Sequence, residues 1–204
     1  MLSIALSATL CVLAAVPASA QTIIEEWSGI ATPAAPALKP VTVDPKTTAL
    51  LMLDFMNQNC GKRPRCIASI PKVKALLAQA RANGMPVVYS LIANTTTADV
   101  MTEVAPAAGE PSVLSGPNKF VRTDLEKILR DKGVQTVIVV GTAANGAVLN
   151  TGAQAAMLGM KVIVPVDGMS SETPYPEQYT AWHFANAPTL AVNATLTKLD
   201  MIKF

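Results

Sequence analysis

The chain has 204 residues, of which half are hydrophobic but only 4% are aromatic, and its formal net charge is +2. That length suits one domain with one buried core, built from Ala, Val, Leu, Ile and Met rather than from aromatic side chains. A charge this close to neutral argues against nucleic acid or an anionic membrane surface as a partner. It favours a small molecule or another protein.

The first segment, residues 1–20, has the pattern of a secretory signal peptide. Its apolar run ends in Ala18-Ser19-Ala20, a small-x-small cleavage pattern. Cleavage after Ala20 predicts a periplasmic or secreted protein that has no membrane attachment once the signal is removed. Residues 21–46 hold four prolines and are predicted to form an extended N-terminal arm, not a helix. Residues 47–204 then form the domain.

Two cysteines remain after the signal, Cys60 and Cys66, in the segment CGKRPRC. In an oxidising compartment they are expected to form a disulfide that closes a small loop. The alternative is a catalytic thiol, since Arg63 and Arg65 would favour a thiolate. A metal site has no support, because the chain contains a single His and no further Cys outside the signal.

Strands and helices alternate along the rest of the chain. Continuous apolar runs predict buried strands, whereas apolar residues at helical spacing predict amphipathic helices. The predicted strands are 48–55, 85–92, 135–142, 161–168 and a short one within 196–202. The predicted helices are 70–84, with Pro71 near its start, then 122–133, 145–159 and 174–187. Residues 94–118 are expected to be a long irregular loop, which in a compact domain is often functional.

This alternation predicts an α/β fold, a three-layer sandwich in which a mainly parallel sheet lies between helices. In such folds the carboxyl ends of the strands form the binding crevice. Asp54 follows one strand, and the Gly141–Ala144 turn follows another. The irregular loop before Lys119 is well placed to cover them.

Four segments in order carry a resemblance to a known family. They are TALLMLDF, the helix after it, FVRTDLEKILRDKG, and VQTVIVVGTAANGAVLNTGAQAAMLGMKVIVPVDG. Together they resemble the isochorismatase-like, or cysteine hydrolase, superfamily, over about residues 47–168. The resemblance implies that superfamily's Rossmann-like hydrolase fold, a homo-oligomer, and hydrolysis of a small molecule.

The resemblance also implies roles for individual residues. Asp54 corresponds to the family's acid–base residue, and Ala147 occupies the position of its nucleophilic Cys. The N–H groups of Ala143 and Ala147 correspond to the oxyanion donors, and the Thr142–Ala143 peptide bond corresponds to one that is commonly cis. The family's Lys is expected near Leu114 when counted back without gaps, whereas the candidate in this chain, Lys119, is five residues later.

Ala147 closes the thioester route, because it offers no nucleophile. We therefore expect a Cys-free hydrolase in which Asp54, with Lys119, runs acid–base hydrolysis of a small amide, ester or enol ether. The alternative is an inactive homologue that binds small molecules or assembles. Candidate substrate-binding residues are Asn57, Gln58, Ala143, Asn145, Tyr175 and Tyr179. No dinucleotide or phosphate-loop motif is present, so we expect no cofactor.

Overall fold

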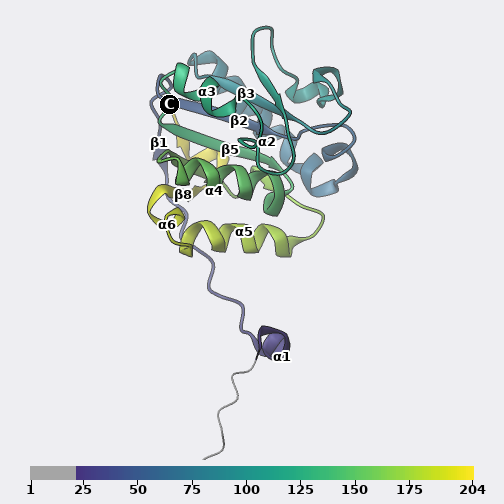
Figure 1. Ribbon diagram of the computed structural model, residues 1–204, viewed down its shortest axis with the longest axis vertical. Coiled ribbons are helices and arrows are strands. Elements are labelled where there is room, and N and C mark those ends of the chain that lie inside the picture. Colours follow the sequence, from purple (N-terminus) through teal and green to yellow (C-terminus); the bar gives the residue numbers. More distant parts are fainter. Residues whose placement is uncertain (1–21) are drawn as a thin grey trace, which may run out of the picture. The chain divides into compact units, whose positions relative to one another are not determined.

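The structure, a computed structural model, describes residues 22–204, so the predicted signal peptide lies outside the described residues. The described residues divide into two units, of which the first ends at Ala34 and the second is Ala35–Phe204. Figure 1 shows the chain coloured along its sequence.

The first unit contains one helical turn where the sequence predicts extended chain. This turn, α1 (Ile23–Glu26), continues into a 3₁₀ helix at Trp27–Gly29. Thr22 and Glu25 form a reciprocal capping box, in which each side chain accepts a hydrogen bond from the backbone N–H of the other. Such a box stabilises a helix start locally. The four prolines that motivated the extended prediction all lie beyond it.

A parallel sheet forms the centre of the second unit. Its strands are β2 (Thr48–Leu53), β3 (Val87–Leu91), β4 (Ser112–Leu114), β5 (Thr136–Thr142), β6 (Lys161–Pro165), β7 (Met169–Ser170) and β8 (Ala194–Thr197). They pair in the order β4-β3-β2-β5-β6-β8, with β7 also beside β5. A separate parallel pair joins β1 (Val41–Thr42) to β9 (Ile202–Lys203).

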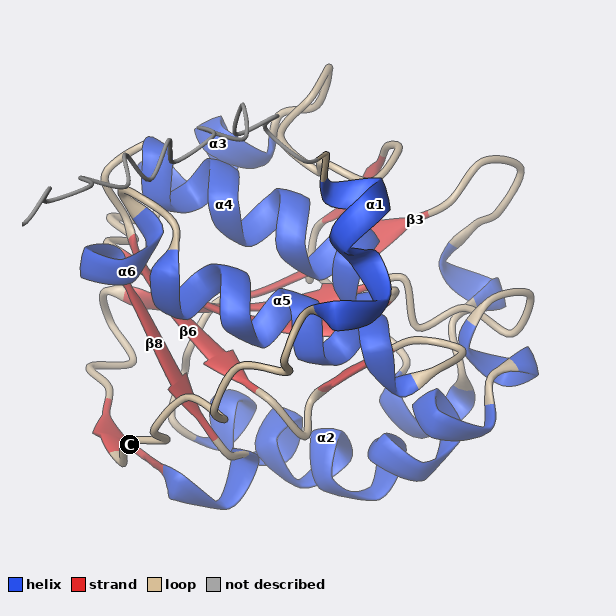
Figure 2. Ribbon diagram, turned by 90° about the horizontal axis from the view of Figure 1, so that it is seen from below, coloured by secondary structure: helices blue, strands red, loops and turns tan. Residues whose placement is uncertain are grey.

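Helices cover both faces of this sheet. They are α2 (Pro64–Ala82), α3 (Leu125–Asp131), α4 (Leu149–Met157), α5 (Pro174–Asn186) and α6 (Leu190–Asn193). Figure 2 shows α2 on one side of the strands and α3, α4 and α5 on the other. The predicted α/β fold with a mainly parallel sheet is therefore confirmed. Within residues 22–204, no helix is both long and apolar enough to cross a membrane.

The strand β2 illustrates why the buried strands have no polar face. Leu50 and Met52 pack into the core cluster that contains α2 side chains, and Leu51 and Leu53 pack into the cluster on the opposite face. A central strand of a parallel sheet is covered on both sides, so both sets of alternating side chains must be apolar. The first polar side chain after this strand, Asp54, lies at its carboxyl end.

Three element boundaries differ from the sequence-based predictions. Helix α2 begins at Pro64, well before Pro71, because Pro64 supplies a favourable first helical residue and Pro71 is tolerated inside the helix. The stretch 94–118 is not wholly irregular: it holds two 3₁₀ turns and the edge strand β4. Residues 196–202 are not one strand, since a 3₁₀ helix at Leu199–Met201 separates β8 from β9.

Gly141 allows β5 and β2 to approach closely. Its φ is +149°, and a Cβ at this position would lie 2.1 Å from the Leu53 carbonyl oxygen. We predict that Gly141→Ala lowers the free energy of unfolding by about 3 kcal/mol or more, because both strands would have to shift. The measurement is urea unfolding followed by circular dichroism.

Gly109→Ala is the matched control for this substitution. Gly109 also has a positive φ, +84°, but open space surrounds its missing Cβ. Its replacement should cost only about 1 kcal/mol, the usual penalty for backbone strain. Equal losses for the two variants would mean that the approach to Leu53 does not constrain the fold.

Candidate active site

The sheet order reverses direction between β2 and β5, and this reversal creates the candidate site. From β2 the chain crosses through α2 to β3 on one side, whereas from β5 it crosses through α4 to β6 on the other. The registers pair Leu53 with both Gly141 and Ser90. Asp54, Ser90 and Thr142 therefore meet at one sheet edge, the usual ligand crevice of such folds.

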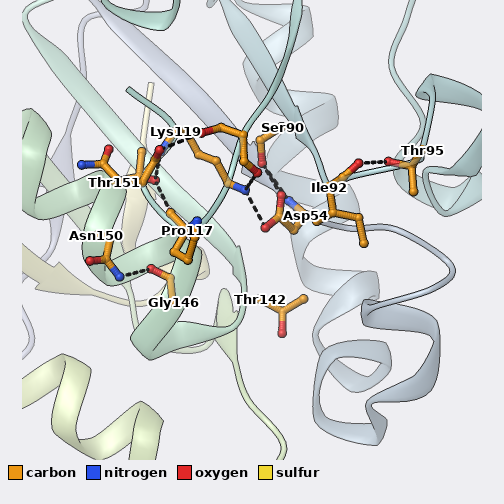
Figure 3. A network of polar contacts seen from close by, with 12 residues as sticks. Asp54, Ser90, Ile92, Thr95, Pro117, Lys119, Thr142, Gly146, Asn150 and Thr151 are labelled. Atoms are coloured by element: carbon orange, nitrogen blue, oxygen red, sulfur yellow. Dashed lines mark hydrogen bonds and ion pairs between the residues drawn. The ribbon is translucent and has the colours of Figure 1, made fainter. Parts of the chain in front are cut away.

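Asp54 is held in a single orientation. It is only 5% exposed, and its φ of +57° turns the backbone out of the strand. Ser90 fixes it from the neighbouring strand: the Ser90 hydroxyl accepts the Asp54 N–H at 3.1 Å and donates to Asp54 Oδ1 at 2.6 Å. Figure 3 shows this pair at the centre of a polar network.

Lys119 pairs with the other oxygen of this carboxylate. Its Nζ lies 2.8 Å from Asp54 Oδ2 and 3.3 Å from the Ser115 carbonyl oxygen, and the residue is 1% exposed (Figure 3). The Lys119 N–H donates to Thr151 Oγ1 on α4, which ties the loop to that helix. A buried ammonium group would be costly without such partners.

The position of the lysine corrects the gapless count that pointed to Leu114. Leu114 ends β4 and is 54% exposed, whereas Lys119 reaches the carboxylate. The chain bends after β4, where the Ser115 hydroxyl lies 2.9 Å from the Asn118 carbonyl oxygen and 3.1 Å from that of Val121, and either oxygen accepts its single proton. Counting along the sequence cannot register such a bend.

A tight turn forms the opposite side of the site. The Thr142–Ala143 peptide bond is cis, and a π-helical segment, Ala144–Val148, leads directly into α4. Ser171 holds the start of this segment by accepting the Ala144 N–H at 3.0 Å. Ala147 lies in the first helical turn, where backbone N–H groups lack intrahelical acceptors and a helix end carries positive partial charge.

A pocket of about 410 Å³ lies between these two sides. Asp54 and Lys119 line it together with the turn residues Thr142, Ala143 and Ala147. Ile92, Ala93, Leu114 and Pro117 add apolar walls. Its size suits a small molecule. None of the described residues that line it is a cysteine.

Cys60 and Cys66 are joined by a disulfide with a Cα–Cα distance of 5.2 Å, and both are fully buried. Neither cysteine is therefore a free thiol in the structure. The closed loop carries Arg63, which lines the pocket and whose Nη1 donates to Thr142 Oγ1 at 3.0 Å. The sequence indicates Arg63 only as a group that would favour a thiolate at the neighbouring cysteines, and carries no signal for this placement.

Five predicted substrate-binding residues do not line this pocket. Gln58 Nε2 instead donates to Asp99 Oδ1 at 2.6 Å, and the backbone N–H of Asn57 donates to the Asp99 carbonyl oxygen at 2.9 Å. Asn145 is exposed on the helical turn, and Tyr175 and Tyr179 are exposed on α5. Proximity in sequence to a strand end does not determine side-chain direction. Of the predicted binding set, Ala143 alone lines the pocket.

A second hollow, of about 540 Å³, lies between α2 and the segment after β6. Its charges are already paired with each other. Arg65 bonds Glu177, which raises the pKa of Arg65, and Lys72 lies 2.9 Å from Asp167. The cations of these two pairs are about half exposed, whereas both members of the Asp54–Lys119 pair are buried, so the pocket at Asp54 is the better candidate. Residues 22–204 contain no cluster of three His, Cys, Asp or Glu suited to a metal ion.

The chain matches one known domain family. A profile of the isochorismatase domain matches residues 48–197. Among curated proteins, none matches the chain at a significant level.

Solved structures similar to this chain include three bacterial or archaeal proteins. An isochorismatase family protein from Desulfovibrio vulgaris has 24% identity and a TM-score of 0.67, covering 76% of this chain and 95% of that one. N-carbamoylsarcosine amidase from Thermoplasma acidophilum has 22% identity and a TM-score of 0.66, covering 76% and 97%. Nicotinamidase/pyrazinamidase from Bacillus subtilis has 17% identity and a TM-score of 0.67, covering 74% and 100%. At these identities the likeness establishes the fold.

The buried ion pair gives a stability prediction. Lys119→Met should cost about 3–5 kcal/mol of unfolding free energy, because it leaves the Asp54 carboxylate buried without its partner. In the double variant with Asp54→Asn, the cost should be at least about 1 kcal/mol smaller than the sum of the two single costs. Urea unfolding of the four proteins measures this coupling. Strictly additive costs would contradict a direct pair.

Proposed function

The domain match shows that this chain belongs to the isochorismatase family, and from this we propose its function. The protein is a hydrolase that cleaves a small amide or ester without a cysteine nucleophile. Asp54 activates a water molecule, Lys119 holds Asp54, and the turn at Ala143–Ala147 receives the substrate's carbonyl group.

One observation carries this proposal: a buried carboxylate, fixed by two partners, faces a pocket whose other side is a helix start. Asp54 bonds Ser90 and Lys119 through different oxygens, and each carboxylate oxygen has a further lone pair for a water proton. An ammonium group 2.8 Å away pairs best with an ionised carboxylate, so Asp54 enters the reaction as a base.

The residues that line the pocket include no thiol, which supports water as the nucleophile. Resemblance to the family puts its Cys at position 147, where this chain has Ala, and the two described cysteines form a disulfide. Because the Ala147 methyl group is smaller than a cysteine side chain, it leaves space in the pocket where the sulfur atom would lie. We therefore assign the attacking oxygen to water in the pocket between Asp54 and Ala147.

The reaction then balances in two steps. The water oxygen bonds to the carbonyl carbon while Asp54 takes one water proton, and the carbonyl oxygen becomes an oxyanion. The N–H groups of the turn at Ala143 and Ala147 stabilise that oxyanion. Its collapse breaks the bond to the leaving amine or alcohol, which takes the proton back from Asp54 and leaves a carboxylic acid as the second product.

Two similar structures support an acyl bond as the target. They are named as an amidase and a nicotinamidase, both hydrolases of amides, and they share this fold. An enol ether, the third class compatible with the family, would need an acid where the ion pair favours a base.

The test is a turnover screen of amides, esters and enol ethers with the native protein and Asp54→Asn. General base catalysis contributes about 10²- to 10⁴-fold, so the variant should lose at least about 100-fold in kcat on any amide or ester that the native protein cleaves. Asp131→Asn is the control, because that carboxylate is 61% exposed and, within residues 22–204, forms an ion pair with Lys127 alone.

Equal turnover by Asp54→Asn and native protein would remove Asp54 from the mechanism. Thermal stabilisation by members of the screen without any turnover would instead support the alternative, a binding protein that retains the fold. Faster cleavage of enol ethers than of amides or esters would exclude the base role.

A further inference from the structure

The pocket has more positive than negative charge. Three ionisable side chains line it: Asp54, Lys119 and Arg63. Asp54 and Lys119 neutralise each other at 2.8 Å, so no acid that lines the pocket is left for the Arg63 guanidinium, whose ion pair is with Glu172 outside the lining. A neutral ligand would leave that charge without a partner inside the pocket, whereas an anionic one would complement it.

One nitrogen of the Arg63 guanidinium is hydrogen-bonded to the protein, and the other N–H groups are available to a ligand. Its Nη1 donates to Thr142 Oγ1, and within residues 22–204 this is the guanidinium's one hydrogen bond. A guanidinium has five N–H donors, so the others remain for a ligand. The acid nearest to it, Glu172, lies 3.7 Å from Nε with a side chain that is 77% exposed. Such a long, exposed pair is weak and easily displaced.

The position of Arg63 is set before any ligand binds. It lies inside the loop that the Cys60–Cys66 disulfide closes, and Pro64 begins α2 immediately after it. The side chain itself is 23% exposed. A cation held in this way loses less conformational entropy on binding than a lysine on a free surface loop.

We infer that the substrate carries a carboxylate, which the Arg63 guanidinium binds while the bond to be hydrolysed lies at the turn. This inference rests on the proposed function and adds the substrate class to it. A planar guanidinium with two free donors matches the two oxygens of a carboxylate, and the one positive charge that no lining acid neutralises matches its single negative charge.

The geometry also limits the length of the substrate. Arg63 Nη1 is 3.0 Å from Thr142 Oγ1, and Thr142 is bonded to Ala143. The guanidinium is therefore at most about 8 Å from the Ala143 backbone nitrogen. A carboxylate at Arg63 and a carbonyl group at Ala143 thus belong to one molecule only if a few bonds separate them, as in the monoamide of a short dicarboxylic acid.

The test uses three such monoamides, malonamate, succinamate and glutaramate, each with its neutral diamide. Calorimetry measures the dissociation constants, and ammonia release measures turnover in the same solutions. At least one monoamide should bind more tightly than its diamide. Arg63→Gln should weaken that binding about 10- to 100-fold, as expected for a hydrogen bond to a charged group, and should leave diamide binding within about twofold.

Lys62→Gln is the matched control, because Lys62 is an exposed cation in the same disulfide loop that does not line the pocket. It should leave both ligand types unchanged. Equal weakening of monoamide and diamide by Arg63→Gln would mean that Arg63 only supports Thr142, and would overturn the inference. So would three monoamides that bind no better than their diamides.

The two hypotheses fail in different ways. Monoamides that bind through Arg63 but release no ammonia would support the carboxylate site and reject hydrolysis. Ammonia release that depends on Asp54 but is equal for monoamides and diamides, and unaffected by Arg63→Gln, would support hydrolysis and reject the carboxylate site.

Discussion

The site depends on one buried ion pair, Asp54 with Lys119. Taking both charges out of water costs several kcal/mol for each ion, and their attraction offsets this only with good geometry and further hydrogen bonds. The structure supplies these through Ser90 on the carboxylate and the Ser115 carbonyl on the ammonium. A pair of well-packed apolar residues would stabilise the fold at least as well, so the pair is best understood through its chemistry.

The sheet topology explains where the pair lies. Strand order reverses between β2 and β5, so the strand ends diverge into a crevice there. Gly141 lets the two strands approach, and the chain then passes through the cis bond into a helix start. A carboxylate from one strand consequently faces backbone donors from the next. The proposed acyl hydrolysis rests on this juxtaposition rather than on any one side chain.

Features that depend on burial could be predicted from the sequence, whereas the positions of loop residues could not. Apolar runs predicted the central strands, and Asp54 was found because a carboxylate that ends a buried strand needs a partner. The gapless count assumed a loop of fixed length before Phe120, and so pointed to Leu114 in place of Lys119. Asn57 and Gln58 looked suitable because they follow Asp54, yet the backbone there turns toward Asp99. The position of Arg63 in the pocket was not predicted, because its place between two cysteines suggested an effect on a thiolate instead.

The central claim is that Asp54 activates water without bonding to the substrate. A single turnover in ¹⁸O-labelled water, with enzyme in excess over an amide or ester that it cleaves, tests this most directly. The account predicts that the acid product of this first turnover contains ¹⁸O and that the peptide carrying Asp54 stays unlabelled by mass spectrometry. An unlabelled first product with ¹⁸O in the Asp54 carboxylate would make Asp54 the nucleophile and contradict the account.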